Sequence, residues 1–187
     1  GTEKRSTQRI KFLDKQIEQI ECDVEVMVNE HPRLKEKLEN ICTIKGVGLI
    51  TAVTIVAETN GFNLIRNVRQ LVCYAGYDVV VKQSGTSVNC KPRISHKGNK
   101  HIRRALHFPA LTAVKYNEPL TNFYKRLFEK QKIKMKSYVA VQRKLLVLIY
   151  TLWKNDEVYN PKQQQNSYKC LEQPTGAALT ELDLVRS

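Results

Sequence analysis

Residues 38–58 read LENICTIKGVGLITAVTIVAE, with an apolar segment on each side of a Gly-x-Gly turn. Glycine allows a sharp reversal and a close backbone approach, so the stretch predicts a helix, a tight turn and a second helix, in the form of a helix-hairpin-helix. Free amides at the start of a helix bind anions, and we therefore expect Gly46, Val47 and Gly48 to hold a phosphate. A glycine-rich turn between helices is also often only a turn, and that alternative stays open.

The N-terminal side of this stretch has the pattern of a coiled coil. Apolar residues recur with the spacing 3-4-3-4-3, at Ile10, Leu13, Ile17, Ile20, Val24 and Met27. This seam predicts a helix over about 4–30, ended by Pro32, with a second helix behind it. We assign 1–37 to a coiled coil or helical hairpin. Two alternatives remain: both helices fold back on the core, or the seam pairs with a second copy.

Beyond the turn, the pattern remains mainly helical. Helices are expected over about 66–77, ending at the C-cap Gly76; over 99–115, with a kink before Pro109; over 119–130; and over 138–153. Residues 78–81 read as extended, 82–98 as a long polar, basic loop, and 130–136 as a lysine-rich turn. The fold class is thus mainly α, with one domain over 38–153. A polar, partly mobile tail is expected over 154–187.

The positive charge of the chain is concentrated in one third of its length. The 187 residues carry a formal net charge of +13. Residues 82–144 hold 16 lysines and arginines against two carboxylates, Glu118 and Glu129, whereas the two flanking segments are nearly neutral. Concentration of one sign of charge favours a polyanionic partner, in the first place nucleic acid, over a merely solvated surface.

Several other classes of function are disfavoured. Five scattered cysteines without a Cys-x-x-Cys pair, and four histidines without ligand spacing, predict neither a disulfide framework nor a metal site in this chain. No apolar run approaches the roughly 18 residues of a membrane span. We therefore expect no membrane partner and a cytoplasmic protein. Hydroxyl chemistry remains: Ser84 precedes Gly85 in the basic loop, although Ser-Gly is also an ordinary turn dipeptide.

A succession of blocks in this order resembles the C-terminal transposase domain of the insertion-sequence-110 family. The resemblance covers roughly residues 38–153 and rests on IKGVG (44–48), RQLVCYAGY (69–77), QSG (83–85), RISHKGN (93–99), IRRAL (102–106) and YVAVQRKL (138–145).

The resemblance implies a bridge-RNA-guided DNA recombinase of bacterial or archaeal mobile elements. In this family a serine of the Ser-Gly motif, here Ser84, attacks DNA, and the protein acts as a dimer or tetramer through a coiled coil. In the family, a RuvC-like domain with acidic Mg²⁺ ligands precedes the coiled coil and the C-terminal transposase domain. The RuvC-like domain has no counterpart here, so we expect a C-terminal portion of a longer protein, inactive alone and without a cofactor of its own.

The sequence therefore predicts the DNA-binding and nucleophilic half of a transposase, with DNA and a guide RNA as the expected partners. The residues expected to bind phosphates or stabilise the transition state are Lys82, Lys91, Arg93, Lys97, Lys100, Arg103 and Arg104. Two rival interpretations remain. One is a non-catalytic helix-hairpin-helix module that binds nucleic acid, and the other is a coiled-coil scaffold for oligomerisation.

Overall fold

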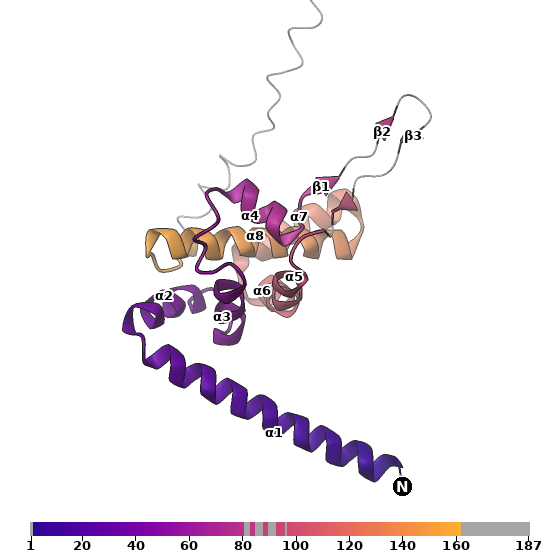
Figure 1. Ribbon diagram of the computed structural model, residues 1–187. Coiled ribbons are helices and arrows are strands. Elements are labelled where there is room, and N and C mark those ends of the chain that lie inside the picture. The colour runs from indigo at the N-terminus through magenta and orange to yellow at the C-terminus, as the bar shows by residue number, and fades with distance from the viewer. Residues whose placement is uncertain (1, 81–82, 85–87, 90–92, 96, 162–187) are drawn as a thin grey trace, which may run out of the picture.

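The computed structural model describes residues 2–80, 83–84, 88–89, 93–95 and 97–161, and this part of the chain is mainly helical, as predicted (Figure 1). The helices are α1 (Thr2–Asn29), α2 (Pro32–Cys42), α3 (Leu49–Glu58), α4 (Val68–Ala75), α5 (Lys100–Ala105), α6 (His107–Tyr116), α7 (Glu118–Gln131) and α8 (Lys134–Asn155). The strands are β1 (Val79–Val80), β2 (Gln83–Ser84), β3 (Val88–Asn89) and β4 (Arg93–Ile94).

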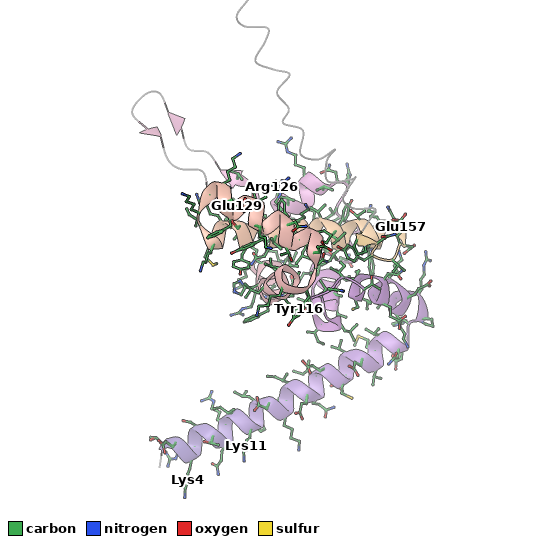
Figure 2. The ribbon with its side chains drawn as sticks, turned by 180° about the vertical axis from the view of Figure 1, so that it is seen from behind. Lys4, Lys11, Tyr116, Arg126, Glu129 and Glu157 are labelled. Carbon is green, nitrogen blue, oxygen red and sulfur yellow. The ribbon has the colours of Figure 1, made fainter. Side chains whose placement is uncertain are left out.

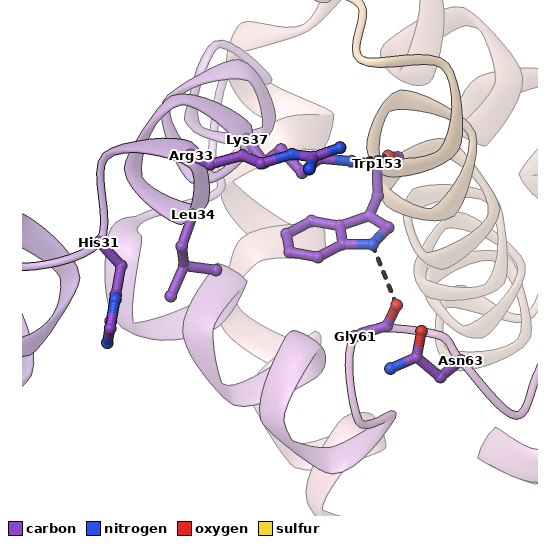
Figure 3. A pocket seen from close by; sticks show the side chains of 7 residues that line it. All are labelled: His31, Arg33, Leu34, Lys37, Gly61, Asn63 and Trp153. Carbon is purple, nitrogen blue, oxygen red and sulfur yellow. Dashed lines mark hydrogen bonds between the residues drawn. The ribbon is translucent and has the colours of Figure 1, made fainter.

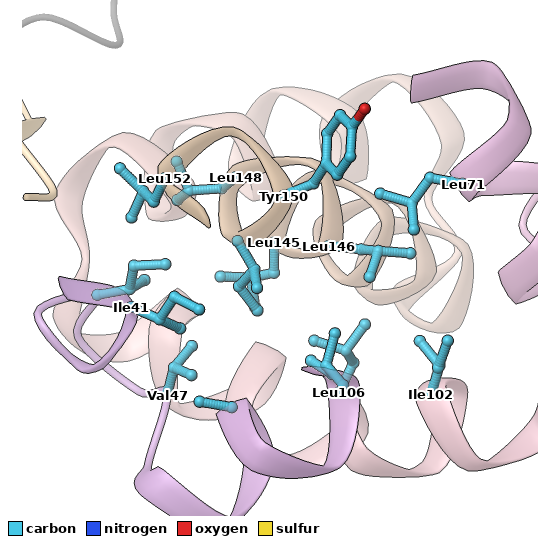
Figure 4. Close-up of a cluster of buried hydrophobic side chains, with 14 of the residues drawn as sticks. Ile41, Val47, Leu71, Ile102, Leu106, Leu145, Leu146, Leu148, Tyr150 and Leu152 are labelled. Atoms are coloured by element: carbon cyan, nitrogen blue, oxygen red, sulfur yellow. The ribbon is translucent and has the colours of Figure 1, made fainter. Parts of the chain in front are cut away.

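Helix α8 forms the centre of the helical body. It contacts α2, α4, α6 and α7, which lie around it. Its leucines point into one apolar cluster together with Ile41 of α2, Leu71 of α4 and Ile102 of α5 (Figure 4). Because these side chains are almost completely buried, this core supplies most of the stability of the helical body.

The predicted helix, turn and helix around Gly46 are present as α2, a short turn and α3. Gly46 has φ +104°, a left-handed conformation that favours glycine. A Cβ built on Gly46 would lie 2.8 Å from the backbone nitrogen of Ala113, so the turn packs directly against α6. This arrangement is compatible with a helix-hairpin-helix, and its second glycine, Gly48, is the N-cap of α3.

The expected C-cap at Gly76 is confirmed. Gly76 has φ +75° and ends α4, which starts at Val68 because the Asn67 side chain caps it by accepting a hydrogen bond from the Gln70 amide. The single helix expected over 99–115 is instead two helices that meet at Leu106. Pro109 lies in the first turn of α6, where a missing N–H breaks no helical hydrogen bond.

Helix α8 begins earlier than predicted. It starts at Lys134 rather than at residue 138, and only Lys132 and Ile133 separate it from α7. Lys132 closes α7 in the left-handed conformation, with φ +54°. The lysine-rich turn expected over 130–136 is therefore a sharp two-residue connection flanked by two helix ends.

The described parts of the expected loop over 82–98 form paired strands. β1 pairs antiparallel with β4, and β2 pairs antiparallel with β3. We call the segment from Val79 to Ile94 the arm. In Figure 1, β1 lies against the helical body and β2 and β3 lie well away from it. Each strand has only two described residues, too few to show an alternating pattern in the sequence.

Helix α1 extends away from the helical body (Figures 1 and 2). Val28 is its one buried residue, whereas seam residues such as Ile17 and Ile20 are exposed. The structure therefore does not show the alternative in which α1 folds back on the core. The pairing of its seam with a second copy stays a prediction.

The helical body continues past the boundary expected at residue 154. Tyr159 is buried: its hydroxyl donates to Asn117 Oδ1 at 3.0 Å and its amide donates to Thr43 Oγ1 at 3.1 Å. Residues 162–187, which contain most of the predicted tail, lie outside the described residues. Within the described part, no helix is both long and apolar enough to cross a membrane.

Candidate nucleic-acid interface

The candidate nucleophile Ser84 lies in the arm. Its backbone belongs to β2 and is paired with Val88 of β3, in the part of the arm farther from the helical body (Figure 1). Arg93 belongs to β4, paired with Val80. Lys82 and Lys91 lie outside the described residues. The fold thus carries Ser84 on a projection rather than in a cleft between helices.

Hydrogen bonds fix the base of the arm to the helical body. The Ser95 amide donates to the Asp78 carbonyl at 2.9 Å, and the Ser95 hydroxyl donates to the Asp78 carboxylate. The Asn99 amide donates to the Tyr74 carbonyl at 2.7 Å. A Cβ on Gly98 would lie 2.2 Å from the Gly76 nitrogen, so only glycine fits there. The arm therefore leaves the body from a fixed point.

Arg103 takes part in this attachment. Its Nη1 donates to the Ala75 carbonyl at 2.8 Å and to the Gly98 carbonyl at 3.0 Å, which ties α5 to the end of α4. This use of the guanidinium is structural. The phosphate contact expected of Arg103 stays a prediction.

Three other predicted cations are accessible. Lys97, Lys100 and Arg104 are exposed, at the end of the arm and along α5. Asn99 caps α5 by accepting from the His101 amide at 2.8 Å, and its side-chain nitrogen donates to Glu58 at 2.6 Å. These cations therefore follow the arm directly in the chain and are positioned by a capped helix.

The Gly46–Gly48 turn offers less backbone to a phosphate than the sequence suggested. The Val47 amide donates to the Ile44 carbonyl at 3.0 Å, and its side chain is buried. Gly46 faces α6. Gly48 is exposed, and nothing lies within 4 Å of the position its Cβ would take. Of the three residues, Gly48 is the one the structure leaves open to an anion at the start of α3.

A second basic element lies at the connection between α7 and α8. We call Lys130–Lys136 the tip; its residues are all exposed. Lysine occupies every second position, at Lys130, Lys132, Lys134 and Lys136. Sequence reasoning identified only a lysine-rich turn here and proposed no role. The available signal was lysine at every second position, with two apolar residues, Ile133 and Met135, between the last three lysines.

The arm and the tip are attached to the same half of α8. Tyr77, just before the arm, donates from its hydroxyl to Gln142 Oε1 at 3.1 Å. Gln142 is eight residues from the start of α8, or roughly 12 Å along the helix axis. Figure 2 labels Arg126 and Glu129 of α7 near the base of the arm. The two basic projections therefore leave one end of the body.

The contact that holds Tyr77 is a buried polar chain. Gln142 Nε2 lies 3.3 Å from His107 Nδ1, which continues the chain to α6. Burial raises the pKa of the Tyr77 hydroxyl well above its usual range, and the nearby Arg103 charge offsets this in part. Tyr77 therefore stays a neutral donor at physiological pH and serves to attach the arm.

The described residues do not form a metal site: none of their His, Cys, Asp or Glu side chains gather in a group of three or more. An open pocket of about 470 Å³ lies elsewhere, at the elbow between α1 and α2 (Figure 3). Its Trp153 donates from Nε1 to the Gly61 carbonyl at 3.0 Å. Trp153 is 19 residues from Lys134, roughly 28 Å along α8 from the tip. The pocket is thus separate from the basic end.

Comparison with known proteins gives a consistent result. Residues 38–125, which run from α2 to α7 and include the arm, match the Transposase IS116/IS110/IS902 family. The chain is 26% identical over 154 residues to the pilin gene-inverting proteins of Moraxella bovis and Moraxella lacunata. These alignments cover 82% of this chain and 48% of each relative, so the chain spans about half the length of the curated relatives it matches. This chain is thus similar over part of its length to the IS116/IS110/IS902 transposases and to proteins named for the inversion of a pilin gene.

Proposed function

We propose that this chain binds DNA and supplies Ser84 as the nucleophile for strand cleavage and exchange in transposition. The observation that carries the proposal is the placement of Ser84 on a projecting arm whose base adjoins the basic end of the body. The family match supports it, as do the relatives, whose name describes inversion of a gene. Inverting a gene requires DNA strands to be cut and rejoined.

The proposed chemistry is a transesterification. The Ser84 hydroxyl oxygen attacks the scissile phosphorus and loses its proton, an oxygen–phosphorus bond forms, and the bond from phosphorus to the leaving deoxyribose oxygen breaks. The leaving oxygen takes up a proton. Because the phosphoserine ester preserves the bond energy of the phosphodiester, rejoining needs no external energy source. Lys97, Lys100 and Arg104 are the described cations proposed to stabilise the developing negative charge.

Mg²⁺, which the resemblance implies for the longer family enzyme, does not fit the described residues of this chain. No step of the proposed chemistry is therefore assigned to a metal here. We propose that acidic ligands, where the protein has them, come from outside the described residues.

Two partners complete the proposal. A guide RNA would share the basic end of the body with DNA, because both present phosphates to the same cations. A second copy of the chain would pair along the seam of α1. Six apolar side chains of this seam at coiled-coil spacing remain unburied or only partly buried within one chain: Ile10, Leu13, Ile17, Ile20, Val24 and Met27.

The nucleophile is tested in the protein expressed from its complete gene. We expect Ser84→Ala to abolish the denaturation-resistant adduct between protein and end-labelled DNA, while DNA affinity changes less than about twofold. Ser87→Ala, three positions further along the same arm, is the matched control and should keep the adduct. Adduct formation at the wild-type rate by Ser84→Ala would falsify the proposed role of this serine.

The rival function, a non-catalytic binding module, predicts the same binding without an adduct. Salt dependence tests the binding that both share: log K should fall linearly with log salt. Lys100→Gln with Arg104→Gln should make the slope shallower by about two units, at roughly 0.9 per phosphate contact. Lys4→Gln with Lys11→Gln, on α1, is the control that should leave the slope unchanged. A flat salt response of the unmodified chain contradicts both functions.

A further inference from the structure

The tip combines a rigid turn with exposed apolar side chains. Ile133, in the two-residue connection, is 46% exposed, and Met135, in the first turn of α8, is 58% exposed. The Lys132 amide donates to the Phe128 carbonyl at 2.7 Å, and the Ser137 amide donates to the Ile133 carbonyl at 3.3 Å. Ser137 itself is buried. These bonds close both helix ends, so the two apolar side chains are presented on a fixed support.

The charge around these side chains is unfavourable without an anion. Lys134 and Lys136 lie in the first turn of α8, which contains no acidic residue. The start of a helix carries partial positive charge, so lysines there are destabilising. Glu129, in the last turn of α7, is the one carboxylate between Lys125 and Lys136. Phosphates on either side of the tip would relieve the repulsion among its four lysines.

We propose that the tip inserts Ile133 and Met135 into the minor groove of double-stranded DNA, where they wedge open a base step and bend the duplex. Proteins that kink DNA from the minor groove use exposed apolar side chains flanked by cations. The lysines contact the phosphates on both edges of the groove, while the apolar pair unstacks the bases between them. This inference rests on the proposed function and names how the same basic end holds its DNA.

The chemistry of the tip favours a duplex over single-stranded nucleic acid. Single strands are bound by stacking of bases on exposed aromatic rings, and Lys130–Lys136 contains no aromatic residue. The rings closest to it in the sequence are those of Phe128 and Tyr138, and both lie against the ring of Tyr124, at 6.1 Å and 4.6 Å between centroids. Aliphatic side chains such as Ile and Met act as wedges between stacked base pairs rather than as stacking platforms.

The tip lies close enough to the base of the arm for a bend in the DNA to affect both. The tip and the base of the arm are attached within about two turns of each other on α8. A duplex bent over the tip curves around this end of the body and brings additional phosphates toward the arm that carries Ser84.

The experiment measures bending of the DNA by energy transfer between dyes at the ends of a 30-base-pair duplex, with the 187-residue chain at saturating concentration. We expect the unmodified chain to increase the transfer efficiency. The double variant Ile133→Ser with Met135→Ser should lose at least half of that increase. Lys132→Gln with Lys134→Gln should keep the bend at saturation but make the salt slope shallower by about two units. Val158→Ser, an equally exposed apolar residue beyond the other end of α8, is the control and should bend DNA like the unmodified chain.

The outcomes separate this inference from the proposed function. If the unmodified chain binds no duplex, the proposed function fails. If it binds but does not bend the duplex, or if the Ile133 and Met135 variant bends it equally, the wedge is wrong and the proposed function stands. Tighter binding to single-stranded RNA through these two side chains, or their requirement for binding anionic lipid vesicles, also overturns the wedge. Ile133→Ala with Met135→Ala repeats the measurement should the serine variant fail to fold.

Discussion

The two longest helices of the chain differ in what covers their apolar residues. α1 has 28 residues and one of them is buried, whereas α8 has 22 residues and nine of them are buried. Both sequences repeat apolar residues at helical spacing. In α8 the apolar positions cover a broad face of the helix, and neighbouring helices pack on several sides of it. In α1 they form a single narrow seam.

This difference separates the stability that one chain supplies by itself from the stability that needs a second chain. The core around α8 is complete within the chain, so it should unfold cooperatively and independently of protein concentration. The seam of α1 has no covering partner in one chain, so its contribution should depend on concentration. Leucine residues in the two helices therefore provide a direct test.

The largest effect is expected from Leu145→Ala in α8. Leu145 is completely buried in the core, and truncation leaves a cavity, so the free energy of unfolding should fall by about 3 kcal/mol. Leu13→Ala, the same change in α1, should alter it by less than about 0.5 kcal/mol at concentrations where the chain is monomeric. Chemical denaturation measures both. Equal losses in the two variants would show that α1 packs on the core after all.

A smaller loss is expected from Gly46→Ala in the turn before α3. The substitution places a Cβ 2.8 Å from the Ala113 nitrogen and forces a residue other than glycine to adopt φ +104°. Together these should cost about 2 kcal/mol or more. Gly48→Ala is the matched control, because Gly48 has an ordinary φ and open space around it. Loss of stability in Gly46→Ala alone would show that the turn belongs to the α8-centred body.

Local signals in the sequence predicted many of the helices and one helix cap. Gly76 could be identified as a C-cap and the Gly46 turn as a junction between helices, because glycine marks left-handed positions. The break at Leu106 was misplaced toward Pro109, since proline fits the first turn of a helix as well as it breaks one.

Contacts between residues far apart in the chain could not be predicted from the sequence. The arm depends on pairing between residues such as Ser84 and Val88 and on the fit of Gly98 against Gly76, neither of which leaves a periodic pattern. Arg103 and Arg104 contribute equally to the charge of the segment, yet the Arg103 guanidinium contacts the backbone carbonyls of Ala75 and Gly98. Charge counts predict that a segment binds anions but do not separate structural cations from exposed ones.

The seam of α1 gives the next prediction. Ile17 is 52% exposed in one chain, and we expect Ile17→Asp to weaken self-association at least about tenfold, because a paired seam would have to bury the carboxylate. Glu18→Asp, which changes a residue next to the seam, is the control. Sedimentation equilibrium measures the association constant. A chain that remains monomeric at high concentration would contradict the proposed pairing.

The smallest effect is expected where α2 meets the end of α8. Lys37 Nζ lies 2.7 Å from Asp156 Oδ1, with the two side chains 19% and 53% exposed, and it also donates to the Trp153 carbonyl at 3.2 Å. Asp156→Asn removes only the ion pair, because asparagine tolerates the left-handed backbone that Asp156 adopts. We expect a loss of about 0.5 kcal/mol, reduced further by salt. Lys37→Met should cost more, since it also removes the bond to Trp153. Lys37 Nζ also lies 5.1 Å from the centroid of the Trp153 ring. If both variants lose the same stability, the ion pair accounts for the whole contribution of Lys37; if Lys37→Met loses more, the hydrogen bond to the Trp153 carbonyl and the contact with its ring contribute as well.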